Sequence, residues 1–102
     1  MTVHMSYLND KATMSIRGRF DFNIHEAFRQ GSEEALAKPA VKNLEVNLRE
    51  VVYLDSSALG MLLLLRDKSL QHVGTKITLS GSSGIVAQVL EVANFSKLFT
   101  IT

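Results

Sequence analysis

Two segments near the start of the chain, residues 2–8 and 12–17, alternate between apolar and polar residues. The alternating apolar positions are Val3, Met5 and Tyr7 in the first segment and Ala12, Met14 and Ile16 in the second. A period of two places such residues on one face of an extended chain, so each segment is expected to form a strand. The Asn-Asp-Lys sequence at residues 9–11 is typical of a turn, which predicts a hairpin.

Helical spacing replaces this alternation after Asn23. Apolar or small residues recur every three or four positions up to Pro39, which predicts an amphipathic helix that ends near the proline. The members of this stripe are Ile24, Ala27, Phe28, Gly31 and Ala35. Asn23 and Glu26 also have the spacing of a capping box, so the helix is expected to begin there. Over residues 43–49 the period returns to two, which predicts a strand with one buried face. That face carries Leu44, Val46 and Leu48.

Residues 51–54 lead from this strand to a second predicted helix, over about residues 55–72. Its start is indicated by a run of good N-cap residues, and Gly74 is expected to end it. The N-cap run consists of Asp55, Ser56 and Ser57. At about 100° per residue, one side of the helix collects a predicted core stripe. The stripe consists of Leu59, Leu62, Leu63, Leu70 and Val73, and the solvent side carries Asp67, Lys68 and Gln71.

Two apolar residues of this helix fall outside the predicted core stripe. Leu64 lies in the middle of the solvent side and Met61 on its flank, so both are expected to be exposed. Burying one such side chain against a partner would contribute about 1.5–3 kcal/mol. They therefore indicate either a protein-binding surface or a neighbouring loop that covers them.

The remaining segments complete an alternating order of strands and helices. Residues 76–79 predict a strand, residues 81–84 a turn, and Asn94 the left-handed end of a third helix. The apolar stripe predicted for that helix consists of Ile85, Val89, Val92 and Ala93. With a last strand at residues 98–101, the order is β, β, α, β, α, β, α, β. It predicts one α/β domain over residues 1–102, a mixed sheet with its helices packed mainly on one face.

Composition narrows the possible functions. The chain has 102 residues, 46% of them hydrophobic, and a formal net charge of +1, which argues against disorder and against nucleic-acid binding. The absence of cysteine excludes disulfides, thiol nucleophiles and thiolate metal sites. The sequence shows neither a secretory signal nor an apolar run long enough to span a bilayer, so a cytoplasmic protein without membrane contacts is expected.

The candidate chemistry is concentrated at the start of the second helix. A helix N-terminus favours an anion, so Asp55 and Ser56 indicate either a simple cap or a phosphoserine site. No Gly-x-Ser-x-Gly elbow surrounds Ser56, and the glycine- and serine-rich turn at residues 81–84 lacks the lysine of a phosphate-binding loop. The histidines, His4, His25 and His72, have no metal-site spacing. No catalytic residue, metal or cofactor is therefore expected.

The whole chain resembles a STAS domain of the stand-alone bacterial type, the fold of anti-sigma factor antagonists. The resemblance rests on Gly18-Arg19-Phe20-Asp21, on Asn47-Leu48-Arg49 and above all on Tyr53-Leu54-Asp55-Ser56-Ser57-Ala58-Leu59-Gly60. It implies that a cognate serine kinase phosphorylates Ser56, and that a PP2C-type phosphatase reverses this. Ala58 departs from the glycine found in many members. Residues 62–65 resemble a Gram-negative subgroup that controls biofilm and motility programmes.

The sequence thus predicts a partner-switching regulator and not an enzyme. Ser56 is the expected phosphoacceptor, Asp55 and Ser57 are its neighbours, and Met61 and Leu64 are expected contacts of an anti-sigma factor or serine kinase. The protein itself is expected to be a monomer or weak dimer. Because STAS domains also occur in lipid-transport and nucleotide-binding systems, a small-ligand or lipid-transport accessory protein is the alternative.

Overall fold

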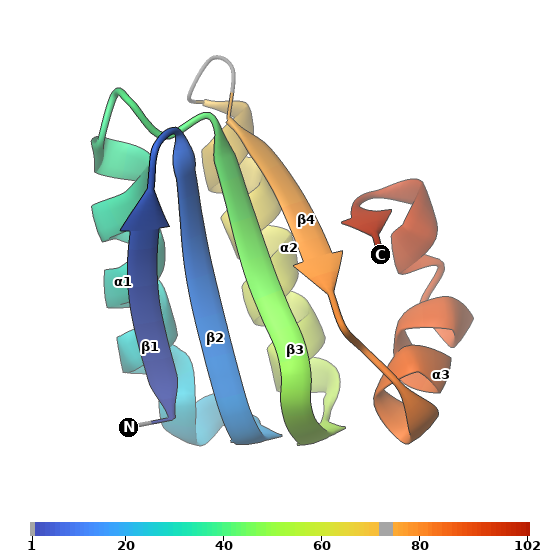
Figure 1. Ribbon diagram of the computed structural model, residues 1–102. Coiled ribbons are helices and arrows are strands. Elements are labelled where there is room, and N and C mark those ends of the chain that lie inside the picture. Colours follow the sequence, from blue (N-terminus) through green and yellow to red (C-terminus); the bar gives the residue numbers. More distant parts are fainter. Residues whose placement is uncertain (1, 72–74) are drawn as a thin grey trace.

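The strands form one mixed sheet whose order follows the chain (Figure 1). The computed structural model describes residues 2–71 and 75–102. Strand β1 (Val3–Leu8) pairs antiparallel with β2 (Lys11–Phe20), which confirms the predicted hairpin. Strands β3 (Asn43–Leu54), β4 (Lys76–Ser80) and β5 (Thr100–Ile101) then add in parallel. The predicted order of elements and the mixed sheet are confirmed.

Helices α1 (His25–Ala37) and α2 (Ser56–Leu70) lie side by side on one face of this sheet (Figure 1). The sheet residues that face them are buried and apolar, and they include Met14, Ile16, Leu44, Val46 and Leu48. The other face of β2 and β3 carries polar side chains such as Thr13, Glu45 and Asn47. The period of two therefore separates a buried apolar face of the sheet from a polar face. The third helix, α3 (Gly84–Val92), follows β4 and contacts β3.

Strand β3 continues five residues beyond the predicted end at residue 49. Its register against β2 shifts twice: β3 advances from Asn47 to Glu50 while β2 advances only from Ser15 to Arg17, and a second shift follows at Gly18. Such bulges insert extra residues and break the period of two. The buried positions in this part of β3 are Leu48, Val51 and Leu54, three residues apart. Alternation alone therefore ended the predicted strand too early.

The capping box predicted at Asn23 and Glu26 is wrong. A short 3-10 helix, η1 (Phe22–Ile24), precedes α1, and its cap is Asp21. The Asn23 amide donates to Oδ1 of Asp21 over 3.0 Å. Helix α1 itself then begins at His25 without a side-chain cap, because the preceding turn already leads the chain into it. The predicted end near Pro39 is confirmed.

The predicted core stripe of α2 is largely wrong. Its buried residues are Ala58, Met61, Leu62, Leu65 and Ser69, whereas Leu63, Leu64 and Leu70 are exposed. Residues 61–65 are all apolar, so apolar side chains occur on every side of the helix and barely indicate which side is buried. The stripe even ends on a serine, whose hydroxyl donates to the carbonyl of Arg66 over 2.7 Å. The predicted stripe residue Val73 and the predicted helix end at Gly74 lie outside the described residues.

The stripe predicted for α3 is also wrong. Val86 and Leu90 are buried, whereas Ile85 is 59% and Val92 84% exposed. The predicted stripe and the observed buried residues both have helical spacing, so the sequence allowed either side of α3 to face the core. The left-handed residue at Asn94 is confirmed, with φ of 60°. After it, the 3-10 helix η2 (Phe95–Lys97) shortens the predicted last strand to β5.

We expect Leu65→Ala and Leu70→Ala to distinguish the observed orientation of α2, which buries Leu65, from the predicted one, which buries Leu70. Leu65 is 1% exposed, so its truncation leaves a cavity and should lower the free energy of unfolding by about 2–5 kcal/mol. Leu70 is 69% exposed, so its truncation should change that free energy by about 0.5 kcal/mol or less. Urea unfolding of the two variants measures the difference. Equal losses would contradict the observed orientation of the helix.

Candidate functional site

The helices begin at one edge of the sheet. The parallel strands β2, β3 and β4 end at this edge, and η1 with α1, α2 and α3 begin there (Figure 1). The first amides of a helix lack intrahelical acceptors and carry the positive end of the helix dipole. The edge where Asp55 follows β3 is therefore suited to negative charge.

Asp55 caps α2, as its place in the predicted N-cap run suggested. Its backbone is extended, with φ of −125°, and Oδ1 accepts a hydrogen bond from the amide of Ala58 over 3.1 Å. The same oxygen accepts from the hydroxyl of Ser57 over 2.6 Å. The Ser57 hydroxyl, followed by the Ala58 amide, holds the pKa of Asp55 below its usual value. The carboxylate thus stays ionised and fixes the first turn.

The two serines of the motif differ in what their hydroxyl groups do. Ser57 is half-buried and its hydroxyl is engaged by Asp55. Ser56 is exposed at the first position of α2, and its hydroxyl makes no hydrogen bond within the described residues. A modifying enzyme would therefore reach Ser56 without disturbing the cap, whereas Ser57 would first have to release Asp55.

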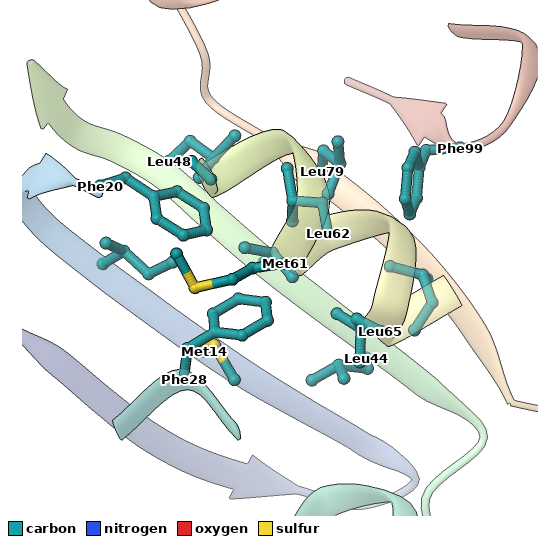
Figure 2. Close-up of a cluster of buried hydrophobic side chains, with 14 of the residues drawn as sticks. Met14, Phe20, Phe28, Leu44, Leu48, Met61, Leu62, Leu65, Leu79 and Phe99 are labelled. Atoms are coloured by element: carbon teal, nitrogen blue, oxygen red, sulfur yellow. The ribbon is translucent and has the colours of Figure 1, made fainter. Parts of the chain in front are cut away.

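The two predicted partner contacts have different environments. Leu64 is 61% exposed, as expected. Met61 is only 8% exposed, so the expectation that it flanks the solvent side is wrong. Its thioether lies between the rings of Phe20 and Phe28, at the contact of α2 with α1 and the sheet (Figure 2). A neighbouring helix, and not a loop, covers Met61.

A second apolar surface lies beside Ser56, and the sequence analysis missed it. We call it the α2–α3 patch; it consists of Leu59, Ile85, Val89, Val92 and Ala93. Leu59 comes one turn after Ser56 on α2, and Ile85 is in the first turn of α3 at the same sheet edge. One signal was available in the sequence: six of the nine residues of α3 are apolar, more than one buried stripe requires.

The described residues offer little for other chemistry. No group of three or more histidine, cysteine or acidic side chains in the described ranges is placed to hold a metal ion. His25 stacks on Phe22, with ring centroids 4.0 Å apart. Among the described helices, none combines the length and apolar character needed to cross a membrane.

Comparisons with known proteins show which family the chain belongs to. The family model "Mlab, STAS domain" matches residues 4–100. The chain belongs to the STAS-domain family. A STAS-domain containing protein of Pseudomonas aeruginosa (strain UCBPP-PA14) is 45% identical over 93 residues, which cover 88% of this chain and 86% of that protein.

Solved STAS structures share the fold at low sequence identity. An anti-sigma factor antagonist of Mycobacterium paratuberculosis superposes with a TM-score of 0.80 at 19% identity, over 98% of this chain and 83% of that one. The unphosphorylated antagonist SpoIIAA gives a TM-score of 0.74 at 20% identity, over 98% and 86% of the two chains. Its phosphorylated form from Bacillus gives 0.73 at 17% identity, over 98% and 90%. The predicted STAS fold and its likeness to anti-sigma factor antagonists are confirmed.

We expect the cap to make stability depend on pH in the acid range. Because folding lowers the pKa of Asp55 below its ordinary value of 3.8, ionised Asp55 stabilises the fold above that value, and the contribution is lost as pH falls through the lower, folded pKa. Asp55→Asn keeps a good cap without the charge. The difference in unfolding temperature between wild type and this variant should be constant near neutral pH and change only below about pH 4. A difference that varies between pH 5 and 8 would contradict this assignment.

Proposed function

We propose that this STAS domain is an anti-sigma factor antagonist whose binding to an anti-sigma factor or serine kinase is switched by phosphorylation of Ser56. The observation that carries the proposal is an exposed, unengaged serine at the capped start of α2, beside the α2–α3 patch. The likeness to antagonists, one of them in a phosphorylated form, supports it. In this role the protein is a substrate of a kinase and a PP2C-type phosphatase, and performs no catalysis itself.

A phosphate on Ser56 would be tolerated by the folded domain. A helix N-terminus stabilises an exposed anion by about 0.3–1 kcal/mol, and by about 2 kcal/mol in favourable sites. Ser56 makes no hydrogen bond within the described residues that a phosphate would break, and the Asp55 cap uses other groups. Phosphorylation is therefore expected to leave the fold intact and not to lower its stability.

The same phosphate would act strongly on a partner. It adds a charge of about −1.5 to −2 at neutral pH. At about 5 Å from a partner's carboxylate and an effective dielectric constant near 20, each pair of unit charges costs on the order of 3 kcal/mol. This is a loss of about two decades in affinity. The switch would thus operate at the interface.

The α2–α3 patch is the surface best placed to be controlled in this way. It starts one turn from Ser56, and its exposed members are aliphatic, with Val92 at 84% and Ile85 at 59% exposure. A partner that covers the patch would bring its own surface close to Ser56 at the same sheet edge. Leu64 lies about two turns after Ser56 on α2, and its role as a partner contact stays a prediction.

Variants of the two serines test the phosphoacceptor. Phosphosite mapping of the protein purified from its native host should find phosphate on Ser56. The partner captured by wild type should be retained by Ser56→Ala and Ser57→Ala, and lost or weakened about tenfold or more by Ser56→Asp. Equal binding by all forms would contradict the proposal. So would phosphate confined to other residues, or a transporter subunit as the retained partner, which would favour the lipid-transport alternative.

Substitutions on the patch test the docking surface. Ile85→Lys and Val92→Lys place a charge where the partner is expected to pack, and each should weaken binding of the purified partner about tenfold or more. Leu70→Lys is the matched control, because Leu70 is 69% exposed at the far end of α2. All three variants should keep the wild-type unfolding temperature within a few degrees. Equal weakening by the control, or none by the patch variants, would place the interface elsewhere.

A further inference from the structure

A basic hollow lies at the far end of α2 from Ser56, on the side of β4 where the C-terminal segment runs (Figure 1). Three elements contribute one cation each to its lining: Arg66 comes from α2, Lys76 from β4 and Lys97 from η2. Among the described residues that line the hollow, none is an aspartate or a glutamate. Every charged side chain of this lining is therefore positive.

Neighbouring carboxylates do not neutralise these cations. Within residues 2–71 and 75–102, no carboxylate oxygen lies within 4.0 Å of a side-chain nitrogen of Arg66, Lys76 or Lys97. Arg29 and Lys68, between α1 and α2, are by contrast both paired with Glu33. The C-terminal end of α2 carries a partial charge of only about −0.5, so it offsets a small part of three full positive charges. The hollow thus keeps a net positive charge for a ligand.

The backbone holds the guanidinium of Arg66 in place. Its Nε donates to the carbonyl of Leu98 over 3.1 Å, and the side chain is half-buried. The two Nη groups of Arg66 make no hydrogen bond within the described residues, so their donors are retained. A planar guanidinium with free Nη donors binds an oxyanion through two parallel hydrogen bonds. Ser96 and Thr100 line the same hollow, and their hydroxyl groups can also donate to an oxyanion.

We propose that this hollow binds a compact polyanion, namely a small ligand that carries a phosphate or pyrophosphate group. A phosphate group carries a charge of about −1.5 to −2 near neutral pH, so it balances more of the three cations than a single carboxylate does. The cations come from three separate elements and meet at one hollow, which suits a compact ligand better than an extended acidic segment. The site goes beyond the proposed switch, because its lining shares no residue with the Ser56 edge or the α2–α3 patch.

Amide NMR with inorganic pyrophosphate tests the proposal on the intact domain. At constant ionic strength, pyrophosphate should cause saturable shifts at Arg66, Lys76 and Lys97 and at the amides beside them. Inorganic phosphate should bind the same place more weakly, because it carries less charge, and acetate should cause no saturable shift there. Hexaglutamate, a probe for an acidic protein segment, should bind more weakly than pyrophosphate.

Single-charge variants test the three cations. Lys76→Gln and Lys97→Gln each remove one exposed charge from the hollow and should each lower the pyrophosphate affinity about two- to fivefold. Lys38→Gln is the matched control and should leave that affinity unchanged. Lys38 lies over the ring of Tyr7 in β1, at the opposite edge of the sheet from β5. Circular dichroism should show the same folded state for all three variants.

Four results would overturn the proposal. Absence of saturable shifts in wild type, or shifts confined to other residues, would mean that the hollow is not a binding site. Equal effects of Lys97→Gln and Lys38→Gln would mean that pyrophosphate responds only to the charge of the whole protein. Hexaglutamate that binds as tightly as pyrophosphate would replace the compact ligand by an acidic protein segment.

Discussion

The position of Ser56 depends on the cap that Asp55 places on α2. One carboxylate oxygen accepts hydrogen bonds from the Ala58 amide and the Ser57 hydroxyl. These contacts fix the first turn of the helix at the end of β3 and occupy Ser57. Ser56 is then the residue of the motif whose side chain points to solvent at a positively polarised helix end. A single short-range interaction thereby distinguishes two adjacent serines.

The balance of charges gives a phosphate at this position a large relative effect. The chain has a formal net charge of +1, so a phosphate of about −1.5 to −2 reverses the sign of the net charge. The phosphate would not disturb the folded structure, because the Asp55 cap and the core below it remain intact. It would weaken partner binding, because the partner's surface must approach the new charge closely in a partly dehydrated interface. In the proposed switch, phosphorylation of this small domain by another protein would thus be converted into a change of affinity.

The sequence predicted most of the elements that depend on local signals, although the capping box at Asn23 and Glu26 was wrong. The hairpin, the order of strands and helices, a cap within residues 55–57 and the left-handed Asn94 each follow from turn, capping or alternation patterns, and the structure assigns the cap to Asp55. The sequence did not predict which side of α2 and α3 faces the sheet. Both helices carry apolar residues on more than one side, so periodicity could not choose between orientations that only the sheet decides.

The same ambiguity carries information about function. Leu59, Ile85 and Val92 were expected in the core, yet they lie partly or largely exposed in the α2–α3 patch. The apolar residues beyond what the core needs therefore indicate a second apolar surface, although periodicity assigned them to the core. Met61 shows the converse: a residue predicted as a surface contact completes the packing between α1, α2 and the sheet.

In the proposed switch, phosphate on Ser56 changes partner affinity and not the fold. Calorimetric titration of the purified partner into unphosphorylated and stoichiometrically phosphorylated protein measures this directly, together with the unfolding temperature of each form. We expect a loss of about two decades in affinity with no fall in the unfolding temperature. Equal affinities would contradict it, and so would a weakened affinity accompanied by a large fall in unfolding temperature, which would mean that the phosphate acts by unfolding the domain.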